Sequence, residues 1–86
     1  MNYLEELIKT IEILRSPEGC EWDRQQTHQT IRQNMLEEAY EAAEAIDENN
    51  PEHIKEELGD VLLQVVLHSQ IAKDNNEFDI QVPYNT

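Results

Sequence analysis

One segment constrains the fold of this chain most: the stretch from Pro51 to about Asn75, which has the pattern of a long helix that is apolar around most of its circumference. One apolar stripe is formed by Ile54, Leu58, Val61, Leu62, Val65 and Ala72. Much of the remaining surface is covered by Leu63, Val66, Leu67 and Ile71. A helix with this pattern is normally buried by its neighbours. We therefore expect the rest of the chain to pack around this helix.

A polar stripe runs along the same predicted helix. It consists of Glu57, Asp60, Gln64 and His68. Ionised carboxylates on a buried helix are costly unless they are paired, hydrogen-bonded or bound to a metal ion. The pattern therefore predicts a specific partner for the two acidic residues.

Two further helices are expected before this one. The first begins after Asn2, a favourable N-cap residue, and ends near Ser16-Pro17. A polar loop follows over residues 16–23, and Thr27 is a suitable N-cap for a second helix that runs to about Glu48. This second helix has an apolar arc of Ile31, Met35, Ala39, Ala42 and Ile46. Strand-like alternation is absent, so the predicted fold class is all-α, a small helical bundle.

A tight turn connects the second and third predicted helices. Asn49 and Asn50 precede Pro51, with Asn50 as the expected N-cap and Pro51 at the first helical position. A turn this short makes the two helices antiparallel neighbours. We expect residues 1–86 to form a single domain, with a helical core over about 2–75 and a short tail over 76–86.

Two pairs of acidic residues lie on these neighbouring helices. Glu38 and Glu41 are three residues apart in one helix, and Glu57 and Asp60 are three apart in the next. Residues at this spacing share a helix face, with Cβ atoms roughly 5–6 Å apart. Each pair alone is more often a solvated face, but two facing pairs bring four carboxylates around one point. A hard divalent cation makes that arrangement inexpensive, so the spacing predicts a magnesium site.

Composition excludes several classes of protein. Six basic side chains stand against nineteen acidic ones, and such a surface repels the phosphate backbone of nucleic acids. No apolar run reaches the roughly 18 residues that a membrane span needs. The single cysteine, Cys20, excludes an internal disulfide, and no N-terminal leader is visible. We expect a cytoplasmic protein with neither a nucleic-acid partner nor a membrane partner.

Four segments of the chain resemble the MazG family of nucleotide pyrophosphohydrolases. Residues 36–41 read Leu-Glu-Glu-Ala-Tyr-Glu, and residues 56–66 read Glu-Glu-Leu-Gly-Asp-Val-Leu-Leu-Gln-Val-Val. These segments are similar to the family hallmark, Glu-Glu-x-x-Glu followed after a spacer by Glu-x-x-Asp. Residues 15–23, Arg-Ser-Pro-Glu-Gly-Cys-Glu-Trp-Asp, and residues 26–28, Gln-Thr-His, resemble a second family segment. The resemblance covers about residues 4 to 80.

The resemblance implies a fold and an activity. The fold is an all-α bundle completed by dimerisation into a four-helix core, so the expected partners are a nucleoside triphosphate and a second copy of the chain, as a homodimer or a higher homo-oligomer. The activity is the Mg²⁺-dependent hydrolysis of nucleoside or deoxynucleoside triphosphates to the monophosphate and pyrophosphate, with Mn²⁺ as an alternative ion. Clearance of non-standard nucleotides is a corresponding role. The alternative from another class is a truncated or catalytically idle helical module that binds metal or a partner.

The resemblance also implies roles for individual residues. By position in the hallmark, the metal ligands are Glu38, Glu41, Glu57 and Asp60. Glu37 is the adjoining acid, either supporting the ligands or acting as a base, although the helical wheel points it away from the apolar arc. All five acids are therefore candidate catalytic residues.

The chain departs from the family pattern at two places. Glu21 stands where the family usually has proline. Family members also continue past the Phe78-Asp79 region into a further helix with basic residues, which is missing here. Cations for the phosphates then have to come from Arg15, Arg24, Arg32, Lys55 or Lys73.

Four residues outside the acidic pairs are candidates for substrate binding. Trp22 is expected either to stack on a nucleobase or to plug the end of the bundle. Asp23 either contacts the sugar or holds its own loop, with an ion pair to Arg24 or Arg32 as the plainer interpretation. Arg32 itself is a candidate phosphate ligand, and His28 either touches phosphate or has a structural role.

An excess of apolar surface predicts self-association. The residues in question are Leu63, Val66, Leu67 and Ile71. Two neighbouring helices cannot cover this surface together with the main stripe, so we expect part of it to meet a second subunit.

Overall fold

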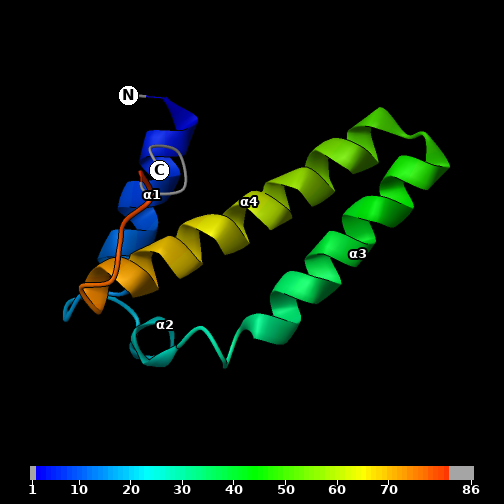
Figure 1. The fold of residues 1–86 in the computed structure, drawn as a ribbon. Helices are drawn as coiled ribbons and strands as arrows, with labels where there is room; N and C mark the ends of the chain where they lie inside the picture. Colours follow the sequence, from blue (N-terminus) through cyan, green and yellow to red (C-terminus); the bar gives the residue numbers. More distant parts are fainter. Residues whose placement is uncertain (1, 82–86) are drawn as a thin grey trace.

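The computed structural model describes residues 2–81, and within this range it contains four helices and no strand (Figure 1). They are α1 (Tyr3–Leu14), α2 (Glu21–Gln25), α3 (Arg32–Glu48) and α4 (Pro51–Asp74). The helices α3 and α4 form a long antiparallel hairpin, and α1 packs against the C-terminal part of α4 (Figure 1). No helix in the described range is long and apolar enough to cross a bilayer. The all-α prediction is confirmed.

The predicted helix ends are confirmed where a local cap determines them. The Asn2 side chain accepts a hydrogen bond from the Glu5 backbone N–H at 2.8 Å, which caps α1. The Asn50 side chain accepts one from the His53 backbone N–H at 3.3 Å, and proline occupies the start of α4. Asn49 ends α3 in the left-handed conformation, with φ of 58°. Side-chain oxygens here replace the missing intrahelical acceptors of the first turn.

Two predicted boundaries are wrong. The second long helix begins at Arg32 rather than after Thr27, because Thr27 and Thr30 each accept a hydrogen bond from the other's backbone N–H and close a separate turn. Such side-chain bonds compete with the helical backbone pattern. The predicted loop over 16–23 also contains the start of the short helix α2 at Glu21.

The core lies where α1, the start of α3 and the C-terminal half of α4 meet. Its buried members are Ile11, Ile31, Val66, Leu67 and Ile71. Leu63 and Ile80 are partly buried and pack against this cluster. The residues predicted to meet a second subunit therefore point into the chain's own core, and that part of the prediction is wrong. The reason is that α1 and the segment after α4 cover the faces that a two-helix hairpin would leave open.

Other apolar side chains of the α3–α4 hairpin remain exposed. On α4 they are Leu58, Leu62 and Val65, and on α3 they are Leu36, Tyr40 and Ile46. Two members of the predicted apolar arc, Ile46 and Ala39, are exposed. Ala45, which the arc omitted, is completely buried. The α3–α4 contact is thus rotated toward Ala42 and Ala45, where small side chains let the two helices approach closely.

A buried arginine holds the segment before α3 against the bundle. The Arg15 side chain, 6% exposed, pairs with Asp74 through Nε at 2.9 Å. Its Nη1 donates to the backbone carbonyls of Asp23 at 2.6 Å and Gln26 at 2.9 Å. Gly19 fits the turn before α2 because a Cβ there would overlap the backbone carbonyls at the end of α1. These contacts fix α2 relative to α1 and α4.

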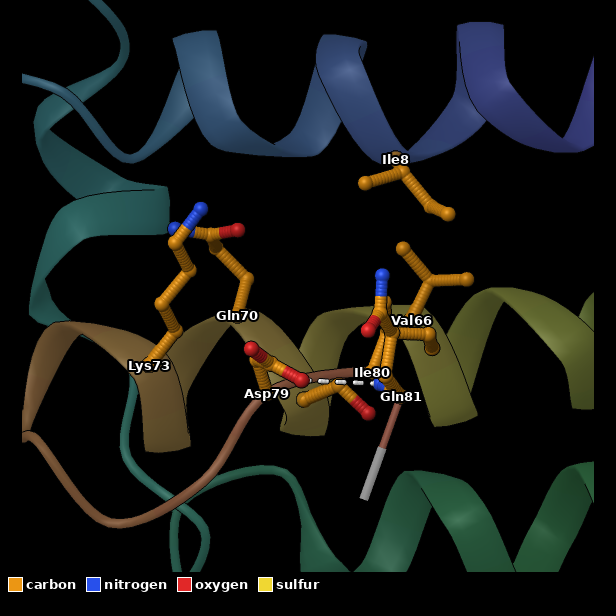
Figure 2. A pocket seen from close by; sticks show the side chains of 8 residues that line it. Ile8, Val66, Gln70, Lys73, Asp79, Ile80 and Gln81 are labelled. Atoms are coloured by element: carbon orange, nitrogen blue, oxygen red, sulfur yellow. Dashed lines mark hydrogen bonds between the residues drawn. The ribbon is translucent and has the colours of Figure 1, made fainter. Parts of the chain in front are cut away.

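A small cavity separates α1 from α4 and the segment that follows it (Figure 2). Its volume is about 130 Å³. Ile8 and Val66 line one part, and Gln70, Lys73 and Asp79 line another. Lys73 pairs with Glu12 of α1 at 3.1 Å, which ties the two helices together beside the cavity.

Candidate metal centre

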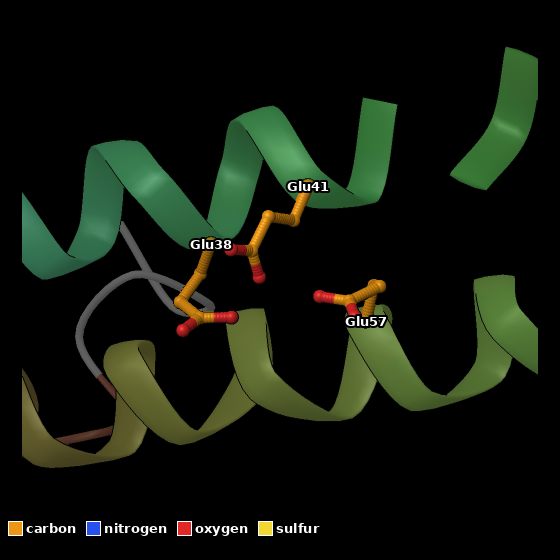
Figure 3. Close-up of side chains that lie close together, drawn as sticks. All are labelled: Glu38, Glu41 and Glu57. Atoms are coloured by element: carbon orange, nitrogen blue, oxygen red, sulfur yellow. The ribbon is translucent and has the colours of Figure 1, made fainter. Parts of the chain in front are cut away.

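Three acidic side chains meet between α3 and α4. Glu38 and Glu41 project from α3, Glu57 projects toward them from α4, and each offers a carboxylate oxygen within 4.8 Å of the others (Figure 3). Helical spacing places the first two on neighbouring turns, and the antiparallel hairpin brings the third opposite them. The geometry is that of a site that offers three oxygen ligands to one cation.

The electrostatics of this cluster fit a bound cation. Oε2 of Glu38 and Oε2 of Glu57 are buried and have no hydrogen-bond partner among the described residues. Burial, followed by the charges of Asp60, Glu41 and Glu57, raises the pKa of Glu38. Burial, followed by the charge of Glu41 and a side-chain hydrogen bond with it, likewise raises the pKa of Glu57. Unpartnered buried oxygens and mutual repulsion are both relieved by a hard cation, so these residues fit Mg²⁺.

Asp60, the fourth predicted ligand, lies close to the cluster but outside the group of three. Its side chain is exposed, and its charge is the largest single charge effect that raises the pKa of Glu38. A carboxylate placed in this way can complete a site from the solvent side. The structure therefore brings three of the four predicted ligands together and leaves the fourth at the edge.

Glu37 lies on the outer face of α3, as its place on the helical wheel indicated. It is exposed and lines a shallow groove with Tyr40 and Glu44. Its charge has the smallest effect among those that raise the pKa of Glu38. The geometry thus separates Glu37 from the three clustered carboxylates.

His53 is a neighbour of the site that the sequence analysis did not single out. Its Nδ1 lies 3.0 Å from Glu48, and its Nε2 lies 3.4 Å from Oε1 of Glu57. The hydrogen bond to Glu48 is the main cause that raises the pKa of His53. The four-residue spacing from His53 to Glu57 was the signal that could have found this contact.

Trp22, Asp23 and Arg32 lie before or at the start of α3, away from the carboxylate cluster. Trp22 is 60% exposed on α2, so it does not plug the bundle. Asp23 is held through its backbone carbonyl by Arg15, while Arg24 donates to the carbonyls of Ser16 and Pro17. The expected ion pair of Asp23 is therefore not formed within residues 2–81.

Arg32 is exposed at the first residue of α3. Glu38 follows six residues later, roughly 9 Å along the helix axis at about 1.5 Å per residue. Six residues at about 100° each also turn Arg32 about 120° around α3 from Glu38, so the two side chains leave the helix in different directions.

His28 contacts a second histidine rather than the carboxylates. Its ring lies nearly parallel to that of His68, with centroids 5.1 Å apart, and the two Nδ1 atoms are within hydrogen-bonding distance at 2.8 Å. Its Nε2 lies 3.3 Å from Glu77. Burial, and then the charge of His28, lower the pKa of His68. Both ring nitrogens of His28 are engaged, which agrees with its structural interpretation.

Most of the chain is similar to known proteins. Residues 26–85 match the family described as the MazG nucleotide pyrophosphohydrolase domain. The chain is 60% identical over 77 residues to a protein of Thermotoga maritima named nucleoside triphosphate pyrophosphohydrolase/pyrophosphatase MazG, an alignment that covers 90% of this chain and 30% of that protein.

Two further relatives also match most of this chain over a small part of their own length. Identity is 42% over 80 residues to an Escherichia coli K12 protein named nucleoside triphosphate pyrophosphohydrolase, covering 92% of this chain and 30% of that one. It is 60% over 67 residues to the uncharacterized protein YabN of Bacillus subtilis, covering 78% and 14%. The chain thus spans less than a third of the length of these relatives.

Proposed function

This chain belongs to the MazG nucleotide pyrophosphohydrolase family, and from that premise we propose that it hydrolyses nucleoside or deoxynucleoside triphosphates to the monophosphate and pyrophosphate in a Mg²⁺-dependent reaction. The observation that carries the proposal is the convergence of Glu38, Glu41 and Glu57, two of which have a buried oxygen that no residue in the range 2–81 hydrogen-bonds. Two relatives whose names state this activity support it. Removal of non-standard nucleotides is the corresponding role.

Four carboxylates would hold the ion: the three clustered glutamates and Asp60 from the edge of the site. Magnesium, or manganese in its place, supplies charge neutralisation for the phosphates and acidifies a bound water. Without a cation, a triphosphate would be repelled strongly by these carboxylates. The oxygen of Asp60 that does not bind the ion would accept the proton of the attacking water. Glu37, the other acid expected as a base, lies on the outer face of α3, apart from the cluster.

Binding of the nucleoside would involve residues nearer the start of α3. The exposed ring of Trp22 presents a face on which a base can stack, and Arg32 presents a guanidinium that can pair with a phosphate. His28 is a weaker candidate than these two, because its ring nitrogens are already engaged with His68 and Glu77.

Self-association would use the exposed apolar side of the hairpin. The side chains chosen for this are Leu58, Leu62 and Val65 of α4 and Ala39 and Ile46 of α3, all of them exposed. Helical spacing places each set on one side of its helix. A second copy packed there would cover apolar side chains that the chain's own helices leave open, which supports a homodimer. Sedimentation of the wild type and of Leu62→Lys tests this, because a charge on this side should shift a dimer toward monomer.

The activity is tested directly with a panel of ribo-, deoxyribo- and non-standard nucleoside triphosphates in Mg²⁺, with the release of pyrophosphate measured. We expect release that is lost in EDTA and in Glu38→Gln but retained in Glu44→Gln, which removes an exposed charge from the same helix. A folded wild-type chain that binds Mg²⁺ yet releases no pyrophosphate from any nucleotide would instead support the idle helical module.

A further inference from the structure

The buried polar atoms that lack a partner in residues 2–81 form one group along the α3–α4 hairpin. They are Oε2 of Glu38, Oε2 of Glu57, Oε1 of Gln64 and Nε2 of His68. A bound cation would satisfy the two glutamates. It leaves the amide and the imidazole unexplained, because His68 is not among the groups that meet at the cluster and Gln64 lies two turns from Glu57 along α4.

These two side chains continue the face of α4 on which Glu57 lies. Spacings of seven and eleven residues keep Gln64 and His68 on that face, roughly 10 and 16 Å from Glu57 along the axis at about 1.5 Å per residue. Gln64 is 7% exposed, and its carbonyl oxygen accepts no hydrogen bond from the described residues. An unsatisfied buried acceptor lowers stability, so its presence calls for a role beyond folding.

His68 is held rigidly enough to serve such a role. Its Nδ1 forms a hydrogen bond with Nδ1 of His28, and this bond orients the ring, which lies nearly parallel to that of His28. Nε2 of His28 faces Glu77. If His28 is neutral and donates from Nε2 to Glu77, its Nδ1 accepts from Nδ1 of His68, and Nε2 of His68 is then an acceptor. If His28 is protonated, its Nδ1 donates to Nδ1 of His68, and Nε2 of His68 is then a donor. In either case His68 presents one unused hydrogen-bonding atom one turn beyond Gln64.

We propose that Gln64, together with His68, is a substrate-binding residue that receives the nucleoside end of the nucleotide. The inference rests on the proposed function. With the phosphates drawn to the cation at the carboxylates, the base and sugar extend away from it, and α4 offers the amide and the imidazole in that direction. The Oε1 atom of Gln64 then accepts from an N–H of the base or an O–H of the sugar, and discrimination follows because a ligand without that donor leaves the buried oxygen unpaired.

The test compares the binding of two kinds of ligand in the presence of Mg²⁺. One is a set of α,β-methylene nucleoside and deoxynucleoside triphosphates with the four common bases, and the other is inorganic tripolyphosphate, which lacks the nucleoside. Calorimetry of Gln64→Met should show roughly 2- to 12-fold weaker binding of at least one nucleotide analogue, which is the effect of losing one hydrogen bond. Binding of tripolyphosphate should be unchanged. A loss that depends on the base assigns the contact to the base, and a loss that depends on the 2′-hydroxyl assigns it to the sugar.

A stability measurement separates a binding role from a structural one. Because Gln64→Met removes an unsatisfied buried oxygen, its Tm should equal or exceed that of the wild type. Gln70→Met is the matched control: Gln70 is equally buried on the same helix but donates to Asp74 at 2.9 Å, so its loss should lower Tm and leave nucleotide binding unchanged. Gln64→Leu provides a second variant with the same expectation for binding.

Three results would overturn the inference alone. Two concern the variants: nucleotide binding unchanged in both Gln64 variants, or an equal loss for nucleotide and tripolyphosphate. The third is equal binding of tripolyphosphate and the analogues by the wild-type chain, because the nucleoside then makes no contact. A wild-type chain that binds neither ligand refutes the proposed function itself.

Discussion

Neutralising Glu38 should make the metal-free chain more stable while abolishing its response to Mg²⁺. Three carboxylate oxygens within 4.8 Å of one another repel by about 3.5 kcal/mol or more per ionised pair at an effective dielectric constant of about 20. The chain can escape part of this cost by protonating Glu38. From the ordinary pKa of 4.5, protonating Glu38 at pH 7 costs about 3.4 kcal/mol, at about 1.36 kcal/mol per pH unit. This cost is the upper limit on the stability that Glu38→Gln can add to the metal-free chain.

Solvent reduces the gain further, because Glu41 is exposed and its charge is screened. We expect Glu38→Gln to stabilise the metal-free chain by about 1–3 kcal/mol, with each 1 kcal/mol raising Tm by about 4–8 °C for a chain of this size. Thermal unfolding followed by circular dichroism at pH 7 in EDTA, at one protein concentration, measures this. In Mg²⁺ the wild type should gain stability and the variant should not.

The control is Glu44→Gln, which changes the net charge by the same amount at an exposed position of α3. It should shift Tm little and should keep the response to Mg²⁺. The reasoning would be refuted if Glu38→Gln lowered Tm in EDTA, or if Mg²⁺ stabilised both variants equally.

Three further predictions concern pH, the buried arginine and the glycines. In EDTA, Tm should rise as the pH falls from 7 to about 5, because folding raises the pKa of Glu38. The stability that protonated Glu38 contributes is fully present below its ordinary pKa and is lost as the pH rises through the raised pKa of the folded chain. Glu38→Gln should flatten this dependence of Tm on pH. Arg15→Met should lower the free energy of unfolding in urea by about 2–4 kcal/mol, because it leaves Asp74 and two carbonyls without their charged donor. Gly59→Ala should stabilise by about 0.5–1 kcal/mol in the same assay, since the added Cβ meets no atom within 4 Å, whereas Gly19→Ala should destabilise by about 1–3 kcal/mol through overlap with the end of α1. The opposite order of the two glycine variants would contradict the geometry.

The candidate site shows where sequence reasoning succeeds and where it stops. The spacing of Glu38 and Glu41, and the tight turn before Pro51, were enough to predict that carboxylates of two helices would face each other. The same spacing placed Asp60 with Glu57, but the structure leaves Asp60 exposed. A three-residue step rotates a side chain by about 60° around the helix, so the rotation of α4 against α3 decides which of the two points inward.

By itself the sequence determined the features that depend on neighbours along the chain. Helix ends follow from Asn2, Asn50 and Pro51 because a cap acts within one turn, and the spacing of acids follows from the helical repeat. Only the tertiary structure decided that α1 covers the C-terminal half of α4, that Arg15 reaches Asp74, and that the open apolar side lies around Leu62. These depend on contacts between residues far apart in the chain, where packing and burial outweigh local preference.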